Sequence, residues 1–137
     1  GDEFGAVGED GEASRTPIPW GSETDPAIAQ RLALYRDLIA LRHAHPVLRT
    51  GGIRWLHVDD EVIVFVRESA DEAVLVFAAS ATSTVTLSAD AVAGLDSASR
   101  GFGEVDLRLT SDGAQLVSDG PAFAAWVLPG VRVPVAG

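Results

Sequence analysis

The stretch EVIVFVRESADEAVLVFAA, residues 61–79, decides the fold that this sequence predicts. It contains two runs of β-branched and aromatic residues, 61–68 and 73–79, separated by Ala70-Asp71. Such runs favour strands, and the polar residues between them favour a turn. Residues 62–66 and 73–79 are apolar on both faces, so they predict central strands that are covered on both sides. The cover is either the segment that precedes them or a larger domain outside this chain.

Further short runs of the same kind lie on both sides of this stretch. They cover residues 52–58, 82–87, 104–109, 114–117 and 122–128. Turn formers separate them, such as Asp59-Asp60, Ser111-Asp112-Gly113 and Ser118-Asp119-Gly120-Pro121. Seven or eight short strands at this spacing predict a mainly β chain, folded as an antiparallel β-sandwich of Greek-key type.

A helix is predicted before the strands. Asp25-Pro26 is a good helix start, because aspartate caps free amides and proline tolerates the first helical position. Apolar residues then recur at three- and four-residue spacing and form one stripe: Ile28, Leu32, Tyr35, Leu38, Ile39 and Leu41. The helix should end near His45-Pro46, because the residue before a proline is disfavoured in helical geometry. Such an amphipathic helix needs a partner.

Composition narrows the class of partner. The 137 residues give room for one ordinary domain and a fragment of a second. A formal net charge of −10 argues against nucleic acid and anionic membranes, so a neutral partner such as a sugar or a peptide fits better. No cysteine, signal peptide or membrane-spanning run is visible, which favours the cytoplasm. A chain that begins without methionine is predicted to be part of a longer protein.

Acidic residues near the start of the chain are candidates for catalytic or calcium-binding groups. Asp2 and Glu3 are adjacent, so on a strand they would point to opposite faces and could not share an acid and base role. The run that contains Glu9, Asp10 and Glu12 lacks the alternating ligands and terminal glutamate of an EF-hand. We therefore interpret it as a solvated loop.

Histidines and serines give no recognisable catalytic arrangement. His43 and His45 lie at the end of the predicted helix, where a cation interacts well with the helix dipole and no third metal ligand is evident. His57 lies on a predicted strand and is interpreted as a surface or packing residue. No serine stands in a Gly-x-Ser-x-Gly elbow, which argues against a serine hydrolase. We expect no cofactor and no metal.

Tryptophan and arginine offer the better binding candidates. Trp20 and Trp55 could stack on sugar rings, which keeps open a stand-alone carbohydrate-binding or protein-interaction sandwich. Trp126 lies in an apolar run and is predicted to pack in the core. Arg15 stands beside a proline-rich turn, where a guanidinium can hold a carboxylate through a bidentate pair. Arg15 is therefore the candidate binding residue.

Three segments taken in order resemble the C-terminal portion of the α-amylase superfamily, glycoside hydrolase family 13. They are GDEFG at 1–5, SRTPIPW at 14–20 and LRHAHPVLRTG at 41–51. The resemblance implies that residues 1–50 are the last strand end, loop and helix of a (β/α)₈ barrel, and that residues 51–137 are the β-sandwich that follows it. Ala78-Ala79-Ser80 departs from the pattern, since many relatives carry an asparagine there.

The resemblance implies that the parent protein is a retaining hydrolase of α-glucans or α-glucosides, such as an α-glucosidase or a maltodextrin-hydrolysing enzyme. A transglycosylase or a trehalose-forming isomerase is the alternative within the superfamily. The family's catalytic carboxylates lie on barrel strands that would precede Gly1, so no catalytic residue is assigned and this chain alone is expected to be inactive. Arg15 matches an arginine near the subsite for the non-reducing glucose, and is expected to bind substrate.

The same resemblance implies the partners of the chain. An α-glucan or malto-oligosaccharide would bind through the missing barrel, and the sandwich would pack against the catalytic domain of the parent. A homodimer is also compatible with it. Nucleic acid and membranes are not expected as partners.

Overall fold

The computed structural model describes residues 1–9, 11 and 15–130. The chain forms two compact units, Gly1–Leu41 and Arg42–Gly137. The first unit contains irregular segments and most of a long helix, and the second contains all the strands. The assignment of residues 1–50 to a barrel and of 51–137 to a sandwich domain remains a prediction.

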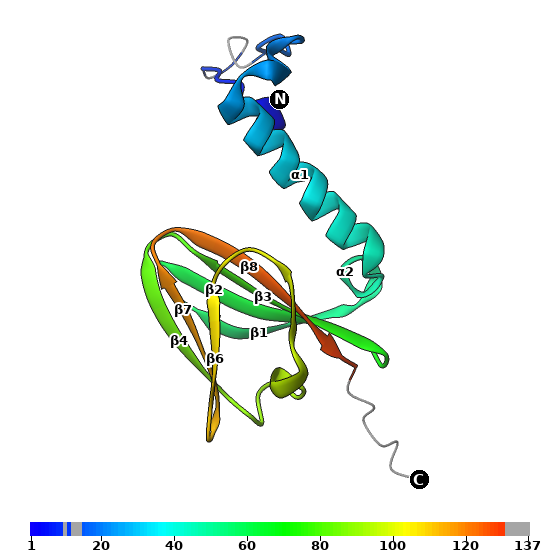
Figure 1. Cartoon of the computed structure of the whole chain (residues 1–137), viewed down its shortest axis with the longest axis vertical. Coiled ribbons are helices and arrows are strands. Elements are labelled where there is room, and N and C mark those ends of the chain that lie inside the picture. The colour runs from blue at the N-terminus through cyan, green and yellow to red at the C-terminus, as the bar shows by residue number, and fades with distance from the viewer. Residues whose placement is uncertain (10, 12–14, 131–137) are drawn as a thin grey trace. The chain divides into compact units, whose positions relative to one another are not determined.

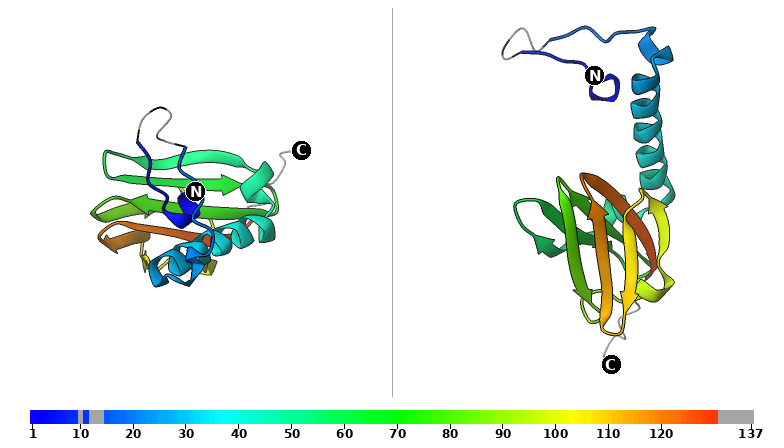
Figure 2. Two further views of the ribbon diagram at one scale, coloured as in Figure 1. Left: turned by 90° about the horizontal axis from the view of Figure 1, so that it is seen from above. Right: turned by 60° about the vertical axis from the view of Figure 1, so that its left-hand side comes forward.

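The second unit is an antiparallel β-sandwich, as the sequence predicted (Figure 1). One sheet has five strands in the order β1-β2-β3-β8-β5, and the other has three in the order β4-β7-β6. The three strands of the smaller sheet lie side by side in the right-hand view of Figure 2. The bounds are β1 Gly52–Val58, β2 Val62–Glu68, β3 Glu72–Ala79, β4 Thr82–Ser88, β5 Ser99–Phe102, β6 Asp106–Thr110, β7 Gly113–Asp119 and β8 Ala122–Pro129. Connections between the sheets place β8 beside β3, which is connectivity of the Greek-key type.

Seven of these strands coincide with predicted runs, and β5 was missed. The sequence of β5 is Ser-Arg-Gly-Phe, which is short and lacks β-branched residues. Its strand conformation comes from pairing with the edge of β8, with an irregularity between Arg100 and Phe102. Residues of β8 that lie 23 or more positions away in the chain therefore decide this element, and local propensity does not.

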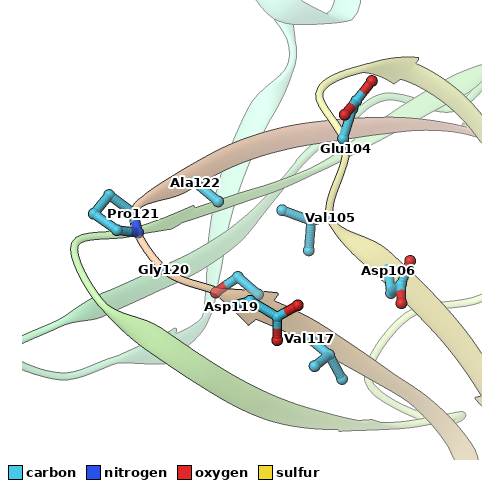
Figure 3. A pocket seen from close by; sticks show the side chains of 9 residues that line it. Glu104, Val105, Asp106, Val117, Asp119, Gly120, Pro121 and Ala122 are labelled. Carbon is cyan, nitrogen blue, oxygen red and sulfur yellow. The ribbon is translucent and has the colours of Figure 1, made fainter.

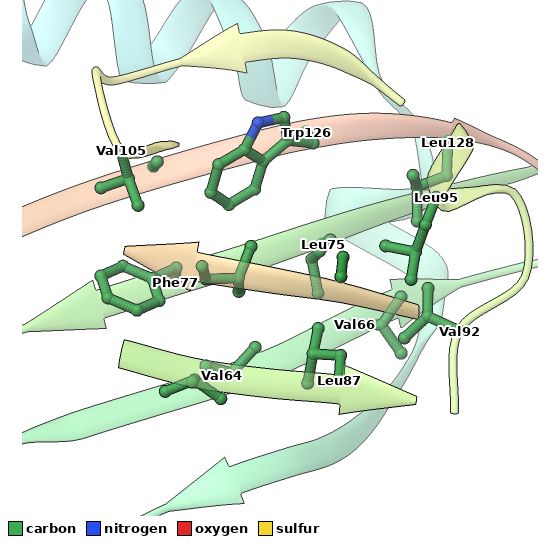
Figure 4. Packing of buried hydrophobic residues seen from close by; sticks show 14 of the residues in the cluster. Val64, Val66, Leu75, Phe77, Leu87, Val92, Leu95, Val105, Trp126 and Leu128 are labelled. Atoms are coloured by element: carbon green, nitrogen blue, oxygen red, sulfur yellow. The ribbon is translucent and has the colours of Figure 1, made fainter. Parts of the chain in front are cut away.

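The core lies between the two sheets (Figure 4). Alternate residues of the central strands point inward, as the period of a strand requires. From the five-stranded sheet they include Val64, Val66, Leu75, Phe77, Trp126 and Leu128, and they meet Val85, Leu87, Ala114 and Leu116 of the other sheet. Val92, Leu95 and Val105 close the ends of the core. Trp126 is only 3% exposed, so its predicted core position is confirmed.

The predicted helix is α1, Pro26–Ala44. Asp25 caps it, because its Oδ1 accepts hydrogen bonds from the amides of Ala27 at 2.9 Å and Ile28 at 3.3 Å. A short helix α2, Val47–Thr50, follows after Pro46. No helix in the described residues is long and apolar enough to cross a membrane.

The segment Asp2–Phe4, expected as the end of a barrel strand, forms the 3₁₀ turn η1. A second 3₁₀ turn, η3, covers Ser22–Thr24. None of the described residues before Gly52 is in a strand. A strand needs a neighbour for its amides and carbonyls, and the described part of the chain offers none to this segment.

Candidate functional site

Arg15, the predicted binding residue, is an exposed side chain of the first unit, in a segment without helix or strand. The next residue, Thr16, donates a hydrogen bond from Oγ1 to the carbonyl oxygen of Val7 at 2.7 Å. This hydrogen bond connects the segment around Thr16 with the segment around Val7. Asp10 and Glu12 lie outside the described residues.

An aromatic contact joins the ends of the same loop region. The rings of Phe4 and Trp20 meet edge to face, with centroids 5.9 Å apart. Phe4 is buried, whereas Trp20 is 76% exposed. The proline-rich arm that carries Arg15 is therefore attached at Thr16 and again at Trp20.

Gly5 shows why the GDEFG segment ends in glycine. Its φ of 67° lies in the left-handed region, which other residues rarely adopt. A Cβ at this position would lie 1.6 Å from Nη1 of Arg31, on the facing side of α1. Glycine thus lets the arginine pass over the η1 turn.

The other polar candidates do not meet at one centre. His43 is exposed in the last turn of α1, and Asp2 and Glu3 lie in the η1 turn. The described residues contain no group of three histidines and carboxylates that could hold a metal ion. The exclusion of a serine hydrolase and the absence of a metal site stay predictions.

His57, interpreted as a surface or packing residue, is half-buried and pairs with Asp59. Its Nε2 lies 2.7 Å from Oδ2 of the carboxylate. Oδ1 of the same carboxylate accepts the amides of Glu61 and Val62 at 2.8 and 2.7 Å. These bonds lower the pKa of Asp59, with the bond from His57 as the largest cause. The group therefore closes the β1–β2 turn and has the surroundings of a structural residue.

The segment from His45 to Gly52 is attached to the sandwich by two side chains. Nδ1 of His45 contacts Oε1 of Glu72 on β3, an arrangement that the helix-dipole interpretation missed. Arg67 on β2 donates to three backbone carbonyl oxygens, those of Leu48 at 3.2 Å, Gly51 at 2.7 Å and Gly52 at 3.1 Å. These partners lie 15 to 27 residues apart in the chain, so no local pattern could have revealed them.

The strand register shows that the five-stranded sheet has a second apolar face. Residues directly opposite each other on antiparallel strands point to the same side. Three rows run across the sheet on the side away from the core: Val58, Ile63, Ala78, Phe123; then Trp55, Phe65, Val76, Ala125, Phe102; then Ile53, Arg67, Val74, Val127, Ser99. We call these three rows the apolar outer face. All but Arg67 and Ser99 are apolar.

Part of the apolar outer face is exposed. The exposed fractions are 53% for Ile53, 56% for Trp55, 62% for Val58 and 39% for Phe123. The ring of Trp55 meets Phe65 at a centroid distance of 5.3 Å and an angle of 63°. Trp55, unlike Trp126, therefore presents its ring to the outside.

The outer face of the three-stranded sheet has the opposite character. The register places on it Thr82, Thr84, Thr86 and Ser88 of β4, Gln115, Val117 and Asp119 of β7, and Asp106, Arg108 and Thr110 of β6. Arg108 and Asp106 form a salt bridge at 2.8 Å. We call this set the hydroxyl outer face. It has the polarity of a face that meets water.

A pocket of about 380 Å³ lies where β6 begins and β7 ends (Figure 3). Its charged lining consists of Glu104, Asp106 and Asp119, and its lining also includes the buried Ser118. No histidine or arginine lines it. The pocket therefore lacks the base that a nucleophilic serine requires.

Solved structures with the same fold were found for nearly the whole chain. An α-amylase from Geobacillus thermoleovorans, complexed with acarbose, is 24% identical with a TM-score of 0.72 over 93% of this chain and 28% of its own. A debranching enzyme from Nostoc punctiforme is 19% identical with a TM-score of 0.73 over 92% of this chain and 26% of its own. An α-amylase from H. orenii is 18% identical with a TM-score of 0.70, over 93% and 31%.

The described fold is similar to that of about a quarter to a third of the chain in each of these α-amylase-family enzymes. The chain spans less than a third of the length of these solved enzymes. A match over 93% of the chain includes residues of both compact units, so the likeness is not confined to the sandwich. No protein-family profile matches the sequence, and the comparison with curated proteins gives no match.

Proposed function

We propose that this chain is the C-terminal part of a glycoside hydrolase of the α-amylase family that acts on α-glucans or α-glucosides. The observation that carries the proposal is the agreement between the three ordered sequence segments and the fold likeness over 93% of the chain. The neighbours with this fold include, by their names, an α-amylase, a debranching enzyme and a cyclic α-maltosyl-(1→6)-maltose hydrolase. We assign the chain to the α-glucosidase or maltodextrin-hydrolysing kind because of its Arg-Thr-Pro turn.

In this proposal the chemistry belongs to residues that precede Gly1. A retaining enzyme uses one carboxylate as nucleophile and a second as acid and base, about 5 Å apart. The chain contributes the substrate-binding Arg15 and the sandwich that stabilises the barrel. A guanidinium can bridge a carboxylate of the pocket and a sugar hydroxyl, which orients both.

The attachments of the loop support this role for Arg15. A substrate-binding arginine gains from a restricted main chain, because less conformational entropy is lost on binding. Pro17 and Pro19 restrict the arm, while the Thr16 hydrogen bond and the Trp20 contact attach it at two points.

The test is hydrolysis of maltose and a nitrophenyl α-glucoside by this chain, by the parent enzyme and by its Arg15→Ala variant. We expect no activity in the chain alone and a loss of about ten- to a hundredfold in kcat/KM for Arg15→Ala, the worth of a charged hydrogen bond. Arg36→Ala, which removes an exposed arginine of α1, is the matched control and should leave kcat/KM unchanged. Activity of the isolated chain, or an unaffected Arg15→Ala enzyme, would contradict the proposal.

A further inference from the structure

We propose that the free edge of strand β4 pairs in antiparallel orientation with the same edge of a second copy of this chain. The two three-stranded sheets then become one six-stranded sheet in the order β6-β7-β4-β4-β7-β6. The inference names a surface for a homodimer, which the family resemblance leaves open, and it does not depend on the proposed function. Among the sheet edges of the described residues, β4 alone lacks the usual protection against pairing.

The four edge strands differ in how they are protected. Natural edges are blocked by charged residues, by prolines, by irregular pairing or by shortness. The pairing of β1 and of β5 is irregular, and β5 has only four residues. The edge strand β6 carries the charged pair Asp106 and Arg108. In contrast, β4 has seven residues, TSTVTLS, without charge or proline, and its pairing with β7 is regular throughout.

One hydrogen bond fixes which backbone groups of β4 face its neighbour. The amide of Ala89 donates to the carbonyl oxygen of Asp112 at 2.8 Å, one step beyond the end of the strand pairing. Hydrogen-bonded and non-bonded pairs alternate along an antiparallel ladder. Val85 and Leu87 therefore turn their amides and carbonyls toward β7.

The free backbone groups of β4 belong to its threonines. Thr82, Thr84 and Thr86 alternate with the residues that bond to β7, so their amides and carbonyls point away from it. In the described part of the chain, no other strand pairs with this side of β4, which lies at the outer side of its sheet in Figure 1. The donors and acceptors for a further strand are therefore in place.

The sequence of β4 is nearly symmetrical about Val85. Thr84 and Thr86 flank it, and Thr82 and Ser88 follow at equal distances on either side. A two-fold axis at Val85 places Thr84 opposite Thr86 of the second copy, so that this pair exchanges two backbone hydrogen bonds. The threonine side chains lie together on the hydroxyl outer face, where threonine pairs stabilise a sheet. The edge is thus complementary to itself.

The charge of the chain also favours this edge over other contacts between copies. A net charge of −10 opposes the approach of two copies, but the segment 80–89 contains no charged residue. Pairing along β4 therefore places no charged pair in the ladder, and the remaining repulsion is long-range and screened by salt. Association should strengthen as salt is added.

The assembly should stop at two copies. A two-fold contact uses the same edge of both chains, so β4 has no free side left once it is paired. The six-stranded sheet then ends on both sides with β6 and its Asp106–Arg108 salt bridge. Charged edges of this kind oppose further pairing.

An extended peptide of a different protein fits the edge less well. Such a peptide loses conformational entropy when it is ordered as a strand. In the second copy, β4 is already held as a strand by β7. Pairing of two preformed edges therefore has the smaller entropic cost.

The first test is self-association of the 137-residue chain, followed by sedimentation between about 10 µM and about 1 mM. An interface of one strand pair is small, so we expect a dissociation constant on the order of 100 µM. This constant should fall at least about threefold when the salt rises from about 0.05 M to about 0.5 M.

A charge swap at two positions tests the register. Thr84→Glu combined with Thr86→Glu sets like charges opposite each other, and should weaken self-association at least about tenfold. Thr84→Arg combined with Thr86→Arg should do the same, whereas an equimolar mixture of the two double variants should form a heterodimer. Thr110→Glu is the matched control, because it lies on the same outer face but on β6, and it should dimerise like the unchanged chain.

Hydrogen exchange of single amides gives a readout that needs no variant. The amides of Thr84 and Thr86 should be protected only at concentrations at which the chain is dimeric. Those of Val85 and Leu87 should be protected at every concentration, because β7 binds them in the monomer. This measurement stands where a substituted edge fails to fold.

Three results would overturn the proposal. The first is a chain that stays monomeric over the whole concentration range at both salt concentrations. The second is a dimer that persists in the double glutamate variant or leaves the amides of Thr84 and Thr86 unprotected. The third is a dimer that is lost in Val58→Glu but kept in that variant, which would assign association to the apolar outer face. None of these readouts involves hydrolysis of a glucoside, so failure of the proposed function would leave them unchanged.

Discussion

The two outer faces of the sandwich differ in a way that their shared core does not explain. Both sheets turn apolar residues inward, yet the three-stranded sheet shows threonines and charges outside while the five-stranded sheet shows Ile53, Trp55 and Phe123. An antiparallel sheet that meets water on one side needs only one apolar face. The five-stranded sheet instead carries apolar residues on both of its sides.

Two neighbouring residues of the edge strand β1, Arg54 and Trp55, show a similar contrast between a charged and an apolar side. Trp55 points outward, whereas its neighbour Arg54 points toward the inner side and forms a bidentate salt bridge with Glu68, with both nitrogen–oxygen distances at 2.9 Å. Arg54 also donates to the carbonyl oxygen of Ala91 at 2.7 Å. The charged groups thus close the rim of the core, and the apolar ring faces away from it.

The largest expected effect tests whether the three-stranded sheet has only one apolar face. Leu116→Ala removes a fully buried side chain of β7, and should lower the free energy of unfolding by about 2–5 kcal/mol. Thr84→Val on the hydroxyl outer face keeps the β-branched shape and should change it by less than about 0.5 kcal/mol. Urea denaturation of the chain measures both. Equal losses would mean that the two faces of this sheet are not distinct.

An intermediate effect is expected where α2 meets the five-stranded sheet. A Cβ on Gly51 would lie 2.7 Å from the carbonyl oxygen of Val47 and 2.9 Å from that of Glu68, so Gly51→Ala must move backbone. We expect a loss of about 1–3 kcal/mol in the free energy of unfolding.

Gly52→Ala is the matched control for this position. The same atom on Gly52 would meet only the carbonyl oxygen of Glu68, at 3.8 Å. We expect no loss of stability, and a gain of up to about 1 kcal/mol is compatible with the reduced freedom of the unfolded chain. If Gly51→Ala is as stable as Gly52→Ala in urea, α2 is not held tightly against the sheet.

The smallest expected effect is the contribution of the Arg54–Glu68 salt bridge to the pH dependence of stability. The hydrogen bonds from Arg54 hold the pKa of Glu68 below its ordinary value of 4.5. A carboxylate with a lowered pKa in the folded state stabilises the fold above its ordinary pKa, and this stabilisation is lost as the pH falls through the folded value. Glu68→Gln should therefore lose stability at pH 7 and lose little at pH 3.

The expected difference is a few tenths of a kcal/mol, because both side chains are more than a third exposed and solvent screens the pair. Glu61→Gln is the control, because Glu61 is an exposed carboxylate just before β2, the strand that ends at Glu68. Unfolding midpoints at pH 3 and pH 7 measure the effect. The same loss at both pH values would show that the pair is not the cause.

Much of the fold could be predicted from the sequence because its signals are local. Asp25-Pro26 predicts the start of α1, and the caps at Asp25 Oδ1 confirm it. The runs of β-branched and aromatic residues at 61–68 and 73–79 predict β2 and β3 to within a residue. The short β5 could not be predicted, because only its pairing with β8 makes it a strand.

The candidate site was less accessible to sequence reasoning. Arg15 was chosen from the motif around it, and its role stays a prediction. The contact of His45 with Glu72 and the three acceptors of Arg67 depend on β-strands that follow far along the chain. The apolar run around Trp126 predicted its core position, but only the strand register shows that Trp55 lies on the other side of the sheet.

The sequence by itself determined the number of strands to within one, the helix and its cap, and the acidic charge that disfavours nucleic acid, because these depend on neighbours within a few residues. Only the tertiary structure decided which sheet each strand joins and which of its faces points outward. That choice follows from pairing across tens of residues, where one register places Trp126 in the core and Trp55 on the apolar outer face.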